Sequence, residues 1–370
     1  MLNCRRCFRL PIPPFTDAAM RGMLAVFAFI ALTALAWGGY GPVLHVGQQK
    51  MGQHEGDKLV APSRMRPFVC VGLAYFGIAV LVPGIVLATR GEVGHWSARG
   101  MVWSLAAGAA GALGALGIIL ALSFRGNPIY VMPLVFGGAP VVNTFFSMLT
   151  SKSYRSVGPF FLAGLILVVA GAACVLIFNP ASHASGGPGL TGVEWVLVPA
   201  SIALTALSWG VYGPVLHWGQ SAMAGSRLRP LICVGLAYFL IAVLIPLAVM
   251  AGYREPGQWN VSGTLWSLGG GAAGAIGALG IIMAFNSGGK PIYVMPLVFG
   301  GAPVVNTFVS MLRGGQGVND LDAPFLAGLI MVVIGTATVL VFAPKGGPAH
   351  KPPAPPPESA AEPSAAESVT

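Results

Sequence analysis

The chain has 370 residues, of which 55% are hydrophobic and only 8% are charged, and its formal net charge at pH 7 is +9. A soluble globular domain carries about 25% charged residues, so this chain has too few charges to cover a water-facing surface. The composition therefore excludes soluble α/β and all-β classes and predicts an integral membrane protein.

Apolar runs of about twenty residues, long enough to cross a bilayer, follow one another along the chain. They predict an all-α integral membrane protein with ten transmembrane helices. Several runs start at proline, whose missing N–H costs nothing at the first position of a helix. The runs are too long, and alternate too little, for β-barrel strands. They span 22–44, 67–89, 101–124, 129–150, 159–179, 194–216, 230–252, 263–286, 291–312 and 324–343.

A five-helix unit is written twice in this sequence. The segment PIYVMPLVFGGAPVVNT occurs letter for letter at 128–144 and again at 291–307. ALTALAWGGYGPVLHVGQ at 31–48 likewise returns as ALTALSWGVYGPVLHWGQ at 203–220. Because five crossings leave a chain on the opposite side of the membrane, the second unit must be inverted relative to the first. The sequence thus predicts two inverted repeats related by a pseudo-twofold axis in the membrane plane.

The repeats divide the chain into a cytoplasmic N-terminal segment (1–20), a first repeat (21–180), a linker (181–193), a second repeat (194–344) and a tail (345–370). The Pro/Ala/Glu-rich tail is predicted to be disordered. Of the Lys and Arg residues, thirteen fall on the side that holds both termini and seven on the other. This bias predicts a multi-pass protein of the cell (inner) membrane with both termini in the cytoplasm. The net positive charge then reflects orientation, and no nucleic-acid partner is expected.

A span rich in small residues, followed by a span that contains prolines, resembles part of a known family. The Gly/Ala-rich third span, a short loop and a Pro-containing fourth span, GALGALGIILALSFRGNPIYVMPLVFGGAPVVNT, resemble the drug/metabolite transporter superfamily, including its EamA-type members. WGGYGP at 37–42 is also similar to a motif of the sugar-uptake branch of that superfamily. The resemblance covers about residues 20–345. It implies that helices one to four and six to nine enclose a central cavity, with five and ten peripheral, and it brings no catalytic residue.

Proline and glycine recur at the same places in the fourth span and in its copy. Proline removes an intrahelical hydrogen bond and glycine loosens the helix, so freed carbonyls could face a cavity and bind a polar ligand. The alternative is a kink accommodated by packing. Interruptions at equivalent positions of two repeats favour a binding or gating site. The candidate interruption residues are Pro133, Gly137, Gly138, Pro140, Pro296, Gly300, Gly301 and Pro303.

Polar and aromatic side chains that recur in both repeats form the candidate substrate site. Asn143 and Asn306 lie well inside their spans, where an amide needs a partner. Trp37 and Tyr40, one helical turn apart, could share a face of a cavity. The full set is Trp37, Tyr40, His45, Tyr75, Tyr130, Asn143, Trp209, Tyr212, His217, Tyr238, Tyr293 and Asn306.

Other interpretations compete for part of this set. An aromatic belt at the membrane interface is preferred for residues near span starts, namely Trp103, Trp266, Tyr130 and Tyr293. Snorkelling to the interface is an equal alternative for His45 and His217. Glycines that recur every three residues predict close helix packing rather than ligand chemistry. They are Gly108, Gly111, Gly114, Gly117, Gly271, Gly274, Gly277 and Gly280.

The function predicted from the sequence is secondary transport of a small polar or amphipathic metabolite, with sugars as one candidate, by alternating access between the inverted repeats. A membrane channel and an integral-membrane enzyme or lipid-handling protein are the alternatives. No HExxH or GxSxG motif is present, and no charged ring of the kind that selects ions stands out. We expect no catalytic residue, cofactor or metal. The expected partners are a small-molecule substrate and membrane lipids, and a homodimer is left open.

Overall fold

The computed structural model describes residues 17–151, 158–178, 192–287, 291–314 and 321–342, and these are almost entirely helical. The predictions made for residues 1–16 of the N-terminal segment, for the linker up to residue 191 and for the tail lie outside the described residues, and residues 17–20 belong to the first helix.

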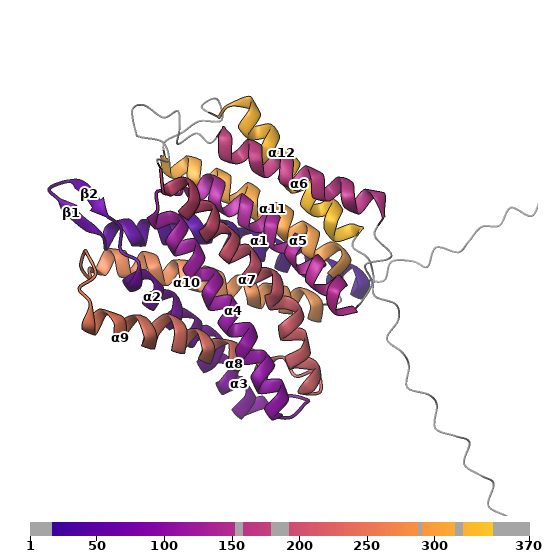
Figure 1. Cartoon of the computed structure of the whole chain (residues 1–370). Coiled ribbons are helices and arrows are strands. Elements are labelled where there is room, and N and C mark those ends of the chain that lie inside the picture. The colour runs from indigo at the N-terminus through magenta and orange to yellow at the C-terminus, as the bar shows by residue number, and fades with distance from the viewer. Residues whose placement is uncertain (1–16, 152–157, 179–191, 288–290, 315–320, 343–370) are drawn as a thin grey trace, which may run out of the picture.

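Twelve α-helices and one small hairpin form the described chain (Figure 1). The first repeat holds α1 (Asp17–Lys50), β1 (Gln53–Glu55), β2 (Lys58–Ala61), α2 (Met65–Tyr75), α3 (Val82–Arg90), α4 (Ala98–Ser123), α5 (Pro128–Ser151) and α6 (Pro159–Ile177). The second repeat holds α7 (Glu194–Ala222), α8 (Leu228–Tyr238), α9 (Ile245–Gly252), α10 (Val261–Asn286), α11 (Pro291–Gly314) and α12 (Ala323–Val341). Strands β1 and β2 pair antiparallel, with His54 opposite Leu59.

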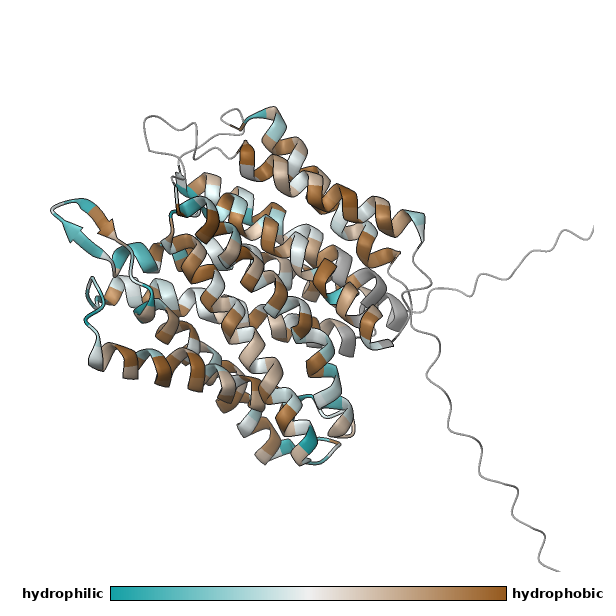
Figure 2. Cartoon of the chain, in the orientation of Figure 1, coloured by the Kyte–Doolittle hydropathy of each residue, from teal (hydrophilic) through white to brown (hydrophobic). Residues whose placement is uncertain are grey.

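The outer surface of the bundle suits a bilayer. Eight helical stretches of the described chain are long and apolar enough to cross a membrane, and Pro159–Val175 is a shorter apolar helix. Large apolar side chains such as Leu35 (61% exposed) and Ile85 (62%) cover the exterior. Hydrophilic residues gather instead at the two ends of the helices (Figure 2). The chain is therefore an all-α membrane protein. Every predicted run falls on a helix, and the count of ten crossings stays a prediction.

Two layers of contacts set the architecture. Helices α6 and α12 pack against each other at one edge of the bundle (Figure 1), with Gly164 against Thr338 and Gly171 against Gly328. The rest of the bundle is built from α1 on α10 and α11, α4 on α7 and α8, and α2 on α10. The β1–β2 hairpin lies at one end of this bundle and the α7–α8 connection at the other (Figure 1).

The two glycine stripes occupy these helix contacts. A Cβ at Gly108 would meet the backbone of Val234, and a Cβ at the matched Gly271 would meet the backbone of Val71. Small residues let helices approach closely in membranes, where packing replaces the hydrophobic effect as the driving force. The prediction of close packing at the glycine stripes is confirmed.

The second span of each repeat contains a π-helical segment, Phe76–Leu81 between α2 and α3 and Phe239–Leu244 between α8 and α9. At the end of the first, the N–H of Val82 bonds to the carbonyl of Gly77, five residues back. A proline follows at once in both copies, Pro83 and Pro246. Its ring crowds the carbonyl four residues earlier, and a widened turn relieves that crowding.

Candidate functional site

A cluster of aromatic rings lies at the centre of the bundle. Trp37 stacks on Phe136 with ring centroids 6.1 Å apart and lies at the same distance from Phe299. Phe136 lies 6.3 Å from both Trp209 and Phe299. Trp37 and Trp209 are matched between the repeats, as are Phe136 and Phe299. Helices α1, α5, α7 and α11 thus bring one matched ring each to a common centre.

The glycine stripes hold the two indoles in place. The indole N–H of Trp37 donates to the Gly274 carbonyl (3.1 Å), and that of Trp209 donates to the Gly111 carbonyl (3.1 Å). A half-buried indole N–H needs such an acceptor, because the indole can only donate. Since each bond joins one repeat to the other, the indoles fix the register of α1 on α10 and of α4 on α7.

Four tyrosines extend the rings into one aromatic cluster, defined here as Trp37, Phe136, Trp209, Phe299, Tyr40, Tyr75, Tyr212 and Tyr238. Tyr75 and Tyr238 stack face to face with centroids 3.9 Å apart, and Tyr40 lies 6.3 Å from Trp209. The buried Tyr40 hydroxyl has no hydrogen-bond partner in the described structure. The cluster offers π-faces and phenol groups and contains no ionisable acid or base of the Asp, Glu, Lys or Arg type. It can bind a neutral ring or an amphipathic molecule by stacking and hydrogen bonding.

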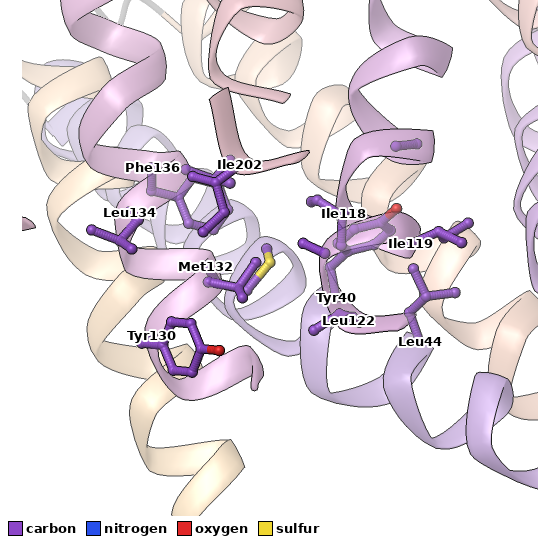
Figure 3. Close-up of a cluster of buried hydrophobic side chains, with 14 of the residues drawn as sticks. Tyr40, Leu44, Ile118, Ile119, Leu122, Tyr130, Met132, Leu134, Phe136 and Ile202 are labelled. Atoms are coloured by element: carbon purple, nitrogen blue, oxygen red, sulfur yellow. The ribbon is translucent and has the colours of Figure 1, made fainter. Parts of the chain in front are cut away.

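The hairpin end of the bundle is sealed by Gln48, near the end of α1. Its amide is fully buried and donates to the Ile119 carbonyl (3.1 Å) and the Ser123 hydroxyl (3.2 Å) of α4. Figure 3 shows Met132 pointing from α5 toward the side of the cluster where Tyr40 lies. The Met132 side chain covers Gly41, where any Cβ would collide with it. We call this the Gln48 end.

Asn306 closes the same end from the second repeat. Its side chain is fully buried, and its amide donates to the Pro128 carbonyl at the start of α5 (2.7 Å). The matched Asn143 is only half-buried and lies beside Gly213. The sequence-based expectation that a buried amide needs a partner is therefore met at Asn306.

The opposite end, which we call the Gln220 end, presents the matched residues differently. Gly41 and Gln48 are buried, whereas their counterparts are more accessible: Gly213 is exposed and Gln220 is half-buried. His45 is half-buried with Nε2 3.0 Å from the Gln49 amide, and its counterpart His217 is exposed. Among the described residues, no side-chain hydrogen bond of Gln220 corresponds to those of Gln48. The two ends have similar sequences and different packing.

The interruption predicted in the fourth span needs correction. Helix α5 runs unbroken from Pro128 to Ser151 through both inner prolines, Pro133 and Pro140. The Thr144 hydroxyl bonds to the Pro140 carbonyl (2.9 Å), and Thr307 does the same at Pro303 (3.0 Å). Each is the bond that a helical Thr hydroxyl commonly makes to the carbonyl four residues earlier. The geometry departs from a regular α-helix in the π-helical segments in the second span of each repeat.

The glycines of that motif lie against other helices. Gly137 and Gly138 line an apolar cavity of about 390 Å³ between α5, α6, α7 and α12. Gly300 and Gly301 are half-buried, and Gly301 packs near Ala34 of α1. The side chains of Pro296 and Tyr293 lie outside the described residues. A gating role for this set stays a prediction.

The predicted aromatic belt is wrong for Tyr130 and stays a prediction for the two tryptophans. Trp266 is 38% exposed, and Trp103 is half-buried against Trp218. Tyr130 is only 1% exposed, because the start of α5 is covered by the closed Gln48 end. Tyr130 therefore belongs to the packed interior.

Sequence reasoning missed two carboxylates that clamp the repeats together. Glu255 accepts the backbone N–H groups of Arg64 and Met65 (2.7 Å for Met65) and the guanidinium of Arg66 (3.0 Å). It thereby caps the N-terminus of α2, where the helix dipole favours an anion. The side chains of Arg66 and Glu255 are 11% and 6% exposed.

Glu92 makes the matched clamp at the other end. It accepts the Ser226 hydroxyl (2.6 Å) and the Arg227 N–H (2.8 Å) and lies 3.6 Å from Arg229. The motifs SRMRP at 63–67 and SRLRP at 226–230 recur in the sequence, and Glu92 and Glu255 hold the same place in both repeats. That recurrence was the signal that could have revealed the pair.

Comparisons with known proteins add the fold. No family model and no curated protein match the chain. A protein of known crystal structure is similar over 88% of this chain and 98% of its own, with a TM-score of 0.52 and 18% sequence identity. At this identity the likeness concerns the fold, and the described helices share their overall arrangement with a solved structure of nearly the same extent.

Proposed function

We propose that the chain is a secondary transporter that moves a small, neutral, polar or amphipathic solute by alternating access. In this proposal ten helices form two inverted five-helix repeats in a cell membrane, with both termini in the cytoplasm. Matched contacts support the pairing. The Trp37 bond to Gly274 is repeated by Trp209 and Gly111, and the Glu255 clamp on α2 is repeated by Glu92 on α8.

The observation that carries the proposal is the difference between matched residues at the two ends. Gln48 is buried and bonded to α4, whereas Gln220 is half-buried. Asn306 is buried and bonded to Pro128, whereas Asn143 is half-buried. Similar sequences in two different arrangements are what a two-state carrier needs, because exchanging the arrangements exchanges the accessible side.

The carboxylate clamps and the hydrogen bonds of Gln48 and Asn306 would have different roles in such a cycle. Both carboxylate clamps are formed in the same structure, so they act as contacts between the repeats that stay formed throughout the cycle. The Gln48 and Asn306 bonds are made at one end, so they act as the gate. Opening it would break the bonds from Gln48 to α4 and from Asn306 to Pro128, and equivalent contacts would form at the Gln220 end.

The aromatic cluster lies between the two ends and is the proposed substrate site. Aromatic faces stack on the apolar faces of sugars and of other ring compounds, and Tyr40 offers an unpartnered hydroxyl. Without a charged side chain in the cluster, an ionised substrate would be poorly compensated. A neutral solute is therefore proposed, and sugars are the first compounds to test.

Two single-cysteine variants test alternating access, each in a protein whose native cysteines have been replaced. Leu44 is 0% exposed at the Gln48 end, and its counterpart Leu216 is half-buried at the Gln220 end. We expect a hydrophilic maleimide to label Leu216→Cys faster than Leu44→Cys in purified protein. A thermal-shift screen of neutral metabolites supplies a ligand, which should change the two labelling rates in opposite directions.

The same experiment separates the alternatives. A channel would open or close both positions together, so parallel changes at Leu44→Cys and Leu216→Cys would contradict alternating access. Uptake by proteoliposomes then distinguishes the classes by kinetics: a carrier saturates with the ligand concentration, and an enzyme converts the ligand into product.

A further inference from the structure

A cavity of about 400 Å³ opens on the outside of the bundle beside Trp266, away from the aromatic cluster. It is lined by Val43 of α1 and by Leu265, Trp266 and Gly269 of α10. Leu265 is 64% exposed and Trp266 is 38% exposed. The cavity therefore faces the surroundings of the helices, which in a membrane are lipid.

Around Trp103, the counterpart of Trp266, aromatic rings from neighbouring helices pack together. There Trp103 packs edge-on against Trp218 (5.0 Å between centroids), and Trp218 lies 5.8 Å from Phe146. On the flank of Trp266, valines stand where the other flank has the added rings: Val46 of α1 is matched with Trp218 of α7, and Val309 of α11 with Phe146 of α5. Aromatic side chains bury about 150–250 Å² each, so their loss leaves Trp266 with an open flank.

A cation stands at the polar rim of this cavity. The guanidinium of Arg313, in the last turn of α11, lies over the Trp266 ring at 4.9 Å. The matched residue in the first repeat is Thr150, so this charge is present in one repeat alone. Arg313 is exposed, and no carboxylate among the described residues forms an ion pair with it. Arginine binds phosphate groups strongly because its planar fork matches their oxygens.

We propose that this cavity binds an anionic phospholipid, with an acyl chain along Val43 and Leu265 and the headgroup phosphate on Arg313. Aliphatic walls open to the bilayer select a lipid tail, and the Arg313 guanidinium, which pairs with no carboxylate of the described residues, selects an anionic headgroup. A free phosphate would use only the guanidinium and would leave the apolar walls empty. The site does not depend on the proposed transport, because it lies outside the aromatic cluster.

Two substitutions remove the two halves of the site. Arg313→Thr copies the residue of the first repeat and removes the charge. Gly269→Leu fills the cavity; a Cβ there meets only Val43, at 3.7 Å, so the helix contact can accept a side chain. The matched controls are Arg254→Thr, which removes an exposed arginine near the same end, and Ala106→Leu, which changes the residue that corresponds to Gly269.

Native mass spectrometry of the full chain in detergent measures the binding. Phosphatidylglycerol is compared with phosphatidylcholine of the same acyl chains. We expect the parent to retain phosphatidylglycerol preferentially and both controls to do the same. Arg313→Thr should lower phosphatidylglycerol binding about tenfold or more, the range for losing a charged hydrogen bond, and Gly269→Leu should lower the binding of both lipids.

Three results would overturn the proposal. Equal retention of the two lipids by the parent would remove the headgroup selectivity. Unchanged phosphatidylglycerol binding in folded Arg313→Thr would remove the phosphate contact, and thermal melting shows whether that variant is folded. Displacement of bound phosphatidylglycerol by millimolar inorganic phosphate would assign the site to a free anion instead of a lipid.

Discussion

The rings of Tyr75 and Tyr238 stack with centroids 3.9 Å apart and planes within 1° of parallel. These tyrosines hold the same position in the two repeats, and the next residues, Phe76 and Phe239, also meet, at 4.7 Å. A residue can contact its own counterpart only near a twofold axis, so the proposed axis passes between these rings. Tyr75 and Tyr238 are the last residues of α2 and α8, and Phe76 and Phe239 are the first residues of the π-helical segments. The two repeats therefore meet at the π-helical turn of each, close to the proposed axis.

The Tyr75–Tyr238 stack should show up as a coupling free energy. We expect Tyr75→Leu and Tyr238→Leu to be non-additive by about 0.5–1.5 kcal/mol, the usual value of an aromatic pair beyond its buried area. Unfolding of purified protein in detergent, measured for both single variants and for the double variant, gives this coupling. Tyr253→Leu is the control, since Tyr253 is 64% exposed. Strict additivity would mean that the stack does not join the repeats.

The indoles should make their glycines intolerant of a methyl group. A Cβ at Gly277 would overlap the ring of Trp37, and one at Gly114 would overlap the ring of Trp209. We expect Gly277→Ala and Gly114→Ala each to destabilise the protein by about 1–3 kcal/mol, the cost of overpacking. Gly39→Ala is the control, because a Cβ there meets nothing within 4 Å. Thermal melting that ranks Gly39→Ala with the other two would contradict the packing.

The helices and part of the candidate site could be predicted from the sequence, and the repeat showed which residues correspond. Hydropathy alone located every helix, because the spans are long and the loops are short and polar. The repeat paired Trp37 with Trp209 and Tyr75 with Tyr238, and the structure brings all four into one cluster. Phe136 and Phe299 were inside the repeated motif and were passed over, since a phenylalanine in an apolar helix looks like ordinary packing.

The remaining features could not be read locally. Pro133 and Pro140 looked like breaks, but both lie within the continuous helix α5. The burial of Tyr130 follows from the packing around the start of α5 at the Gln48 end, which is a tertiary feature and is absent from the residue pattern. The Glu92 and Glu255 clamps join loops to helix starts more than a hundred residues away, and only tertiary contact shows that each carboxylate caps a helix of the other repeat.

The carboxylate clamps should contribute to stability at both ends. Glu255→Ala removes the cap of α2 and leaves the buried Arg66 guanidinium without its carboxylate partner. We therefore expect the free energy of unfolding to fall by about 2–3 kcal/mol. Glu92→Ala should have a similar effect at α8. Because the clamps lie at opposite ends, the two losses should add. Glu55→Ala in the exposed strand β1 is the control. Unfolding in detergent measures all three, and a clamp variant as stable as the control would contradict the role of the clamps as lasting contacts between the repeats.

The remaining question is whether transport is coupled to a proton gradient, and the two matched histidines are the first groups to consider. Proton-driven carriers place an ionisable group in the membrane, where its protonation can bias one state. No Asp, Glu, Lys or Arg lies inside the ends of any predicted span. His45 and His217 are the matched histidines of the two repeats; His45 is held against Gln49, and His217 is exposed. The surroundings of the two histidines differ mainly because the Gln48 end and the Gln220 end are packed differently. We therefore expect uncoupled, facilitated transport.

Uptake into proteoliposomes with and without an imposed pH gradient tests this, using a ligand from the metabolite screen. We expect equal final accumulation under both conditions, both for the parent and for the variant that carries His45→Gln with His217→Gln. Gradient-driven accumulation that disappears in the double variant would assign coupling to the histidines. Gradient-driven accumulation that survives it would require another group, and Glu194 is the first to examine because it is a carboxylate at the start of α7, 3.7 Å from Arg125.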